Sequence, residues 1–145
     1  MVSKKLTVIP SIRTSWKTWQ ENHPKSLVLS TETGHSRDYN LDPYAGYYRV
    51  GTIWFPVGEV RKDLSPKARI LGIEINGDSK AYPLKALASN PGTIKDGIGR
   101  STIRIEINKA GEIVSIKDEA GKPVPHLFAY WFAWQAFHPD TKVYK

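Results

Sequence analysis

The chain contains no cysteine. This absence excludes disulfide bonds, iron–sulfur clusters, zinc sites built on thiolates and enzymes that use a thiol nucleophile. It leaves the compartment open, because both cytosolic and exported proteins can lack cysteine.

Long apolar runs are also missing. No stretch approaches the roughly 20 apolar residues that a membrane span requires, and Lys4 and Lys5 are not followed by the apolar core of a signal peptide. We therefore do not expect an integral membrane protein, and we expect no signal peptide in the chain as given.

Familiar catalytic motifs are absent too, since the sequence has no nucleophile elbow, no His-Glu-x-x-His pattern and no Walker sequence. The fragment Gly97-Ile98-Gly99-Arg100 precedes an expected strand, whereas a phosphate-binding loop leads into a helix. On these grounds no cofactor is predicted.

What is present fits one domain with a core rich in aromatic residues. The 145 residues include five Trp, seven Tyr and four Phe, and the net charge is +7. Residues 1–30 hold five basic side chains against Glu21 alone, a balance of +4. Such a basic end is able to steer an anionic ligand or a protein partner, but we favour the simpler interpretation of a solvated basic surface. Nucleic acid is not expected, because no basic run is interleaved with aromatic residues.

One motif occurs twice: Trp-x-x-Trp-x-x-x-His-Pro-x-Ser/Thr-x-Val runs from Trp16 to Val28 and again from Trp131 to Val143. On a helix, positions 0, 3 and 7 share one face, so each copy predicts a stripe of two Trp and one His. We expect both Trp pairs to pack in the core rather than form exposed platforms for flat ligands.

The two histidines of the motif allow two interpretations. In the first, His23 and His138 face each other and bind a metal or share a proton. In the second, each ends a helix, where its ring donates to the last free carbonyls and the following Pro prevents continuation. We favour the structural reading, because two histidines fall short of a zinc ligand set. No metal is predicted, and within the repeated motif the candidate ligands are His23 and His138.

Between the two copies the pattern predicts antiparallel strands. Asn76-Gly77 between apolar runs indicates a hairpin over residues 69–84, and strict alternation from Ile103 indicates a second hairpin that returns through residues 114–116. Further strands are expected at 26–30 and 53–57, and short helices at 16–23, 84–88 and 127–137. The expected fold is α+β: an antiparallel sheet or small barrel with short helices near both termini. It forms a single domain over 16–145 behind an N-terminal arm, 1–15.

A long loop, residues 33–48, is the expected functional region. It opens with Gly34 and places His35, Arg37 and Asp38 close together, the residue types that proton transfer with an anion clamp requires. The group matches no defined catalytic motif, and loop Asp and Arg residues more often pair to hold the loop itself. The same loop carries the candidate ligand-binding residues Tyr39, Tyr44 and Tyr47.

Several stretches together resemble a family catalogued as a domain of unknown function, family 3179. The stretches are His23-Pro24, Val28–Ser30, Thr33–Tyr39, Asp42–Tyr44, Tyr47, Phe55–Val57, Ile70–Glu74, Lys80–Leu84 and Trp131–Thr141. The resemblance is to the C-terminal half of longer members. Their upstream half carries a cysteine-containing motif, and no redox or metal chemistry of that motif transfers to this chain. Members are frequently exported, which implies a periplasmic or secreted location.

The family has no established activity, so two hypotheses remain. The first is a small, exported, non-catalytic binding or accessory module that uses the Tyr-rich loop 33–48. The second is an enzyme or metal-binding protein centred on His35, with Asp38 and Arg37.

Overall fold

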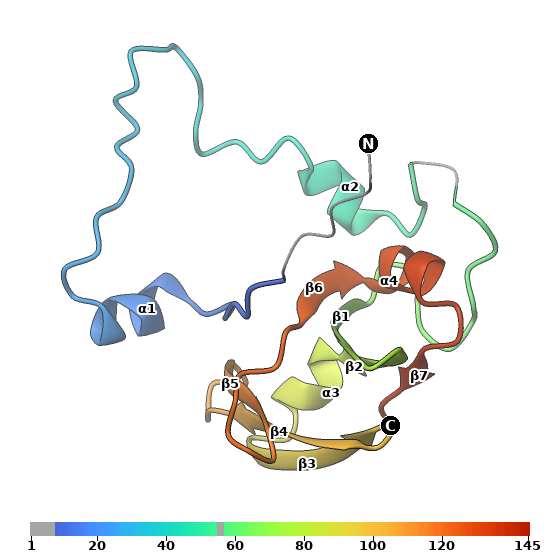
Figure 1. The fold of residues 1–145 in the computed structure, drawn as a ribbon. Helices are drawn as coiled ribbons and strands as arrows, with labels where there is room; N and C mark the ends of the chain where they lie inside the picture. Colours follow the sequence, from blue (N-terminus) through green and yellow to red (C-terminus); the bar gives the residue numbers. More distant parts are fainter. Residues whose placement is uncertain (1–7, 55–56) are drawn as a thin grey trace, which may run out of the picture.

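The structure is a computed structural model that describes residues 8–54 and 57–145 (Figure 1). Within them lie a four-stranded sheet, a three-stranded sheet and four short helices. The predicted α+β class is confirmed, and the two sheets close no barrel in the described part of the chain. No helix there is long and apolar enough to cross a membrane.

The first sheet is built around the predicted hairpin, with strand order β6-β1-β2-β7. Strands β1 (Arg69–Ile75) and β2 (Asp78–Pro83) pair antiparallel across Asn76 and Gly77, whose φ angles are 54° and 88°. Positive φ at both turn residues is what a two-residue type I′ turn requires. β6 (Leu127–Tyr130) pairs with β1, and β7 (Lys142–Val143) lies parallel to β2.

The second sheet contains the other predicted hairpin. Ile103 and Ile105 of β4 (Ser101–Ile107) point into the core, and β5 (Ile113–Asp118) pairs beside it. The opposite edge, β3 (Gly92–Ile98), was not expected from the sequence. Helix α3 (Leu84–Ala88) joins the two sheets, as predicted.

Strand β1 is buried on both faces. Leu71 and Ile73 face the core shared with the second sheet, whereas Ile70 packs with Trp131 and Trp134 in a separate cluster. A continuous apolar run over one strand is the pattern expected of a strand covered on both sides.

The C-terminal segment differs from its prediction. Residues 127–130 form strand β6, and helix α4 is confined to Trp131–Phe137. A run that is apolar on all sides is compatible with either structure, and pairing with β1 decides for a strand in its first four residues.

Within residues 8–54 the regular structure consists of two short helices, α1 (Trp16–Asn22) and α2 (Ala45–Arg49). The strands predicted at 26–30 and 53–57 are wrong: residues 26–30, 53–54 and 57 lie in no strand, and 55–56 fall outside the described residues. A strand needs a partner, and none pairs with these segments. Residues 8–14 of the arm are also irregular, and 1–7 lie outside the described residues. Figure 1 shows α1 and the following loop reaching away from both sheets.

Candidate functional site

The His35 loop is open to solvent. His35, Arg37 and Asp38 are all exposed, and none of them lines the four main clefts of the described residues. Asp38 serves its own loop: its Oδ1 accepts from the backbone of Asn40 at 2.9 Å, and its carbonyl accepts from Leu41 at 3.4 Å. The main clefts therefore lie elsewhere, and the role of the predicted catalytic group stays a prediction.

The three candidate tyrosines have different surroundings. The Tyr39 hydroxyl lies against that of Thr33, and Tyr44 is 56% exposed. Tyr47 is buried, with its ring edge-on to Trp54 and the ammonium of Lys67 3.3 Å from its ring centre. Tyr39 and Tyr44 are thus open to a ligand, whereas Tyr47 holds α2 in place.

The histidines do not form a shared centre. Within residues 8–54 and 57–145, no three His, Asp or Glu side chains are placed to hold a metal ion. His23 lines a cleft together with Asn108 and Ile113. His138 lies near Glu74, with 3.6 Å between its Nδ1 and Glu74 Oε2. Figure 1 shows their helices well apart, with α1 at the left of the view and α4 beside β1 and β6.

The repeated motif instead builds the same helix-ending corner twice, and only the second copy continues into a strand, β7. In both copies the His backbone N–H donates to the second Trp carbonyl, at 2.8 Å for His23 and 3.0 Å for His138. The second Trp then donates from Nε1 to the motif hydroxyl, at 2.8 Å to Ser26 and 3.0 Å to Thr141. The His ring stacks on the same Trp, with centroids 4.0 and 3.8 Å apart. The reading as a helix-ending corner fits, except that the ring stacks on Trp rather than bonding to carbonyls.

The C-terminal corner, residues 131–143, is docked on the first sheet. Trp131 and Trp134 are 0% and 4% exposed. The six-membered ring of Trp134 occupies the space beside Gly72, where an added Cβ would lie 2.4 Å from its Cε3. After the corner, Val143 pairs in parallel with Ala81 of β2.

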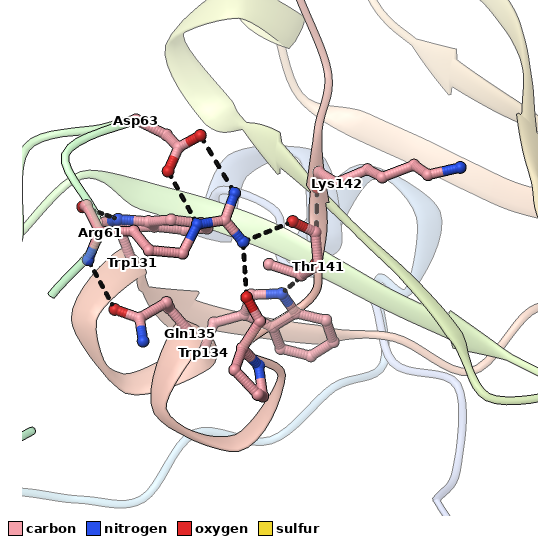
Figure 2. A network of polar contacts seen from close by, with 8 residues as sticks. Arg61, Asp63, Trp131, Trp134, Gln135, Thr141 and Lys142 are labelled. Atoms are coloured by element: carbon pink, nitrogen blue, oxygen red, sulfur yellow. Dashed lines mark hydrogen bonds and ion pairs between the residues drawn. The ribbon is translucent and has the colours of Figure 1, made fainter. Parts of the chain in front are cut away.

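Arg61 fastens this corner from outside (Figure 2). Its Nη1 donates to the carbonyls of Pro139 at 2.7 Å and Thr141 at 2.8 Å. Its backbone N–H donates to Gln135 Oε1 at 2.9 Å, and its carbonyl accepts from Trp131 Nε1 at 2.9 Å. An ion pair with Asp63 at 2.9 Å holds the guanidinium in place.

Sequence reasoning missed a matched position here. Gln135 and Gln20 share the offset of 115 residues that relates the two motif copies. The glutamine that accepts a hydrogen bond from the Arg61 backbone N–H in the C-terminal corner is therefore also present in the first corner. Comparison of the two motif copies was enough to find it.

The N-terminal corner, residues 15–29, repeats this geometry without a docking surface. Trp16 and Trp19 are 48% and 40% exposed, so the expectation that both Trp pairs lie in the core is wrong for the first pair. Its attachment to the core is through Glu112, whose carboxylate accepts from the Ser15 backbone at 3.0 Å and the Thr18 hydroxyl at 2.9 Å. Hydrogen bonds, first from Asn108 and then from Thr18 and Ser15, lower the pKa of Glu112 to about 2.

A basic cleft of about 620 Å³ lies between the N-terminal arm and the edge of the first sheet. Its cationic side chains are Arg13, Lys67 and Arg69, and Ile70 and Phe128 contribute apolar walls. A neighbouring cleft shares all three cations. The Lys67 ammonium already donates to the carbonyls of Tyr47 and Val50 and its pKa is lowered by desolvation. Arg13 and Arg69 make no ion pair in the described part of the chain.

A half-buried polar cluster joins β2 to β3. Asp96 accepts from the Tyr82 hydroxyl at 2.8 Å and pairs with the Lys80 ammonium at 2.6 Å. Burial works to raise the pKa of Asp96, but the hydrogen bonds from Lys80 and Tyr82 outweigh it and lower the pKa; burial and the Asp96 contact raise the pKa of Tyr82. No cleft opens at this cluster among those described, so its contacts hold the two sheets together.

These features define an α+β protein of two small sheets, closed at its C-terminal end by a docked corner and carrying a second, exposed corner. The chain belongs to the family described as "Protein of unknown function (DUF3179)", whose model matches residues 1–122. This confirms the resemblance drawn from the sequence, although the matched range ends before the run Trp131–Thr141. No curated protein and no solved structure matches the chain.

Proposed function

We propose that this protein is a non-catalytic binding module that holds a protein partner on its N-terminal segment, residues 8–54, which includes the Tyr-rich loop 33–48. The observation that carries this proposal is the distribution of exposed apolar side chains. Of the eighteen large hydrophobic side chains that are exposed in the described structure, fourteen lie in this segment.

So many exposed apolar side chains in one segment are unusual for a monomer, because apolar surface that gathers in one region is normally buried or used for binding. The core clusters take their members from Val60 onward and are complete without the segment. Leu27 and Leu29 are 98% and 97% exposed, which leaves nearly all of their apolar surface available to a partner. The family resemblance adds the expectation that binding takes place outside the cytoplasm.

The test uses the full chain and a variant with Leu27→Asp and Leu29→Asp. Proteins retained by each are identified by mass spectrometry, and a candidate partner is then purified and titrated by calorimetry at several temperatures. We expect binding with a negative heat-capacity change, because apolar surface is buried, and at least about a tenfold loss of affinity in the variant. The matched control is Leu127→Asp, which changes an exposed leucine outside the segment. Equal affinity of the wild type and the Leu27/Leu29 variant contradicts the proposal.

A second candidate function is binding of a small anionic ligand in the basic cleft. The specific observation is the pairing of Arg13 and Arg69 with an apolar wall, which suits a ligand with an apolar body and a carboxylate or phosphate group. Titration with aromatic carboxylates and with inorganic phosphate separates this function from partner binding. Arg69→Ala is expected to weaken binding about tenfold or more, whereas Arg104→Ala, an exposed arginine of the second sheet, serves as the control.

The alternative of an enzyme or metal-binding protein centred on His35 remains a separate proposal. Its basis is the residue set His35, Arg37 and Asp38, and the exposed loop offers no water-excluded site around it. Metal analysis of protein purified without an affinity tag tests it directly. A stoichiometric metal that is lost in His35→Ala favours this alternative over the binding module.

A further inference from the structure

The docked C-terminal corner shows what this motif requires of its acceptor. First, a strand glycine, Gly72, leaves room for the second Trp ring. Second, the acceptor needs a strand edge for parallel pairing. Here β2 supplies it, with Val143 opposite Ala81 and the Tyr144 N–H donating to the Ala81 carbonyl at 2.9 Å. Third, an arginine, Arg61, satisfies the corner carbonyls and pairs its backbone N–H with the motif glutamine.

The N-terminal corner presents four of the five matching residues to solvent, and the fifth, Ser26, is half-buried. Trp16, Trp19, Gln20, Ser26 and Val28 correspond to the docked residues at an offset of 115. The backbone is already set, since φ and ψ are −134° and 66° at His23 against −131° and 68° at His138. Docking therefore requires little reordering of this corner, which lowers the entropic cost of binding.

The segment that follows the N-terminal corner is suited to pairing with a strand edge, although it forms no strand in the described structure. Leu27, Val28 and Leu29 are 98%, 68% and 97% exposed and correspond in position to Lys142, Val143 and Tyr144. They lie in no sheet, and their backbone groups are available for pairing with a strand edge. The carbonyls of Pro24 and Ser26, which correspond to those that Arg61 satisfies in the docked corner, receive no guanidinium in the described structure.

The acceptor within this chain is already occupied. The C-terminal corner follows β6 directly, so its effective concentration at β1 and β2 is on the order of millimolar or higher. A corner of equal chemistry that arrives on another molecule therefore cannot efficiently displace the C-terminal corner from this acceptor. The surface that fits the N-terminal corner is therefore an acceptor of the same kind whose own corner is missing.

We propose that residues 15–29 dock on such a vacant acceptor, presented by a partner protein of the same family. The acceptor is a β-hairpin with a glycine beneath Trp19, a free strand edge for Leu27–Leu29, and an arginine for the carbonyls of Pro24 and Ser26. This inference deepens the proposed function and rests on it, because it names the partner that the N-terminal segment binds.

The absence of cysteine makes a direct test of register possible. The donor is the full chain with Val28→Cys, and the acceptor is the full chain with Ala81→Cys and Val143→Asp, which weakens its own β7. Under mild oxidation we expect a Val28–Ala81 crosslink, because Val28 takes the place of Val143 opposite Ala81. Its yield should be at least about tenfold above that with Val114→Cys, an exposed position of the second sheet. Trp19→Ala in the donor should abolish the excess.

A second acceptor guards against misfolding of the first. Ala81→Cys alone keeps Val143 and the docked corner, and it should give the same crosslink more slowly, in proportion to the rare opening of that corner. Equal yields at positions 81 and 114, or a yield at 81 that Trp19→Ala leaves unchanged, overturn the inference. If Leu27→Asp with Leu29→Asp still abolishes binding of a purified partner while no crosslink forms at 81, the binding module stands and only the acceptor's identity fails.

Discussion

At the scale of single residues, Gly72 determines whether the C-terminal corner can dock. The Trp134 ring occupies the space that a side chain at position 72 would take. This ring is buried and hydrogen-bonded to Thr141, so it cannot easily move aside. Substitution Gly72→Ala is expected to lower the free energy of unfolding by about 3 kcal/mol, the upper range for overpacking a filled core. Urea denaturation followed by tryptophan fluorescence measures this change.

Gly46→Ala is the matched control for that substitution. An added Cβ at position 46 meets nothing within 4 Å, and the residue lies in helix α2, where alanine is favourable. The midpoint of unfolding should stay the same or rise slightly. A Gly72→Ala variant as stable as Gly46→Ala would mean that Trp134 does not pack against β1 as described.

At the scale of elements, Glu112 attaches α1 to the second sheet. The folded pKa of about 2 lies below the ordinary value near 4.5, so the attachment is complete above about pH 4.5 and is lost as the pH falls towards 2. We expect the Ser15 and Trp19 signals in NMR spectra to change in that pH window. In Glu112→Gln the change should disappear, with α1 loosened at every pH.

The control is Glu106→Gln, whose carboxylate bonds Ser115 within its own sheet and has no contact with α1. It should leave the Ser15 signal and its pH dependence as in the wild type. The same titration of Ser15 in Glu112→Gln would show that another group holds the helix.

The elements also show how far the sequence predicts this fold. Both hairpins were predictable, because Asn76-Gly77 and the alternation from Ile103 are local signals of backbone geometry and burial. β3 was missed, since Gly92–Ile98 is an edge strand without clean alternation. Residues 26–30 have strand propensity but no partner, which sequence alone does not reveal.

The candidate site was predictable only in part. The corner was visible because its anchors recur at a fixed offset, and Gln20 was readable from the same alignment. Arg61 and Glu112 were not, because each acts on a corner more than seventy residues away in the chain, through contacts that only the fold creates. The exposure of Trp16 and Trp19 depends on what lies opposite them, which a helical period does not encode.

At the scale of the whole molecule, the two corners divide the chain into unequal parts. From Val60 onward, two sheets and a docked corner bury the described core, whereas residues 23–44 carry no helix or strand. Lys25 and Arg37 are exposed there, and their backbone needs little or no local unfolding to enter the active site of a protease.

Trypsin should therefore cleave at Lys25 and Arg37 about a hundredfold faster than at Lys117 or Arg104 of the second sheet, and intact-mass spectrometry over time resolves the order. Docking of residues 15–29 on a partner should slow cleavage at Lys25, which lies inside the corner, and leave cleavage at Arg37 unchanged. Cleavage at Arg104 as fast as at Arg37 would contradict this division, because it would place the second sheet and the open loop at the same local stability.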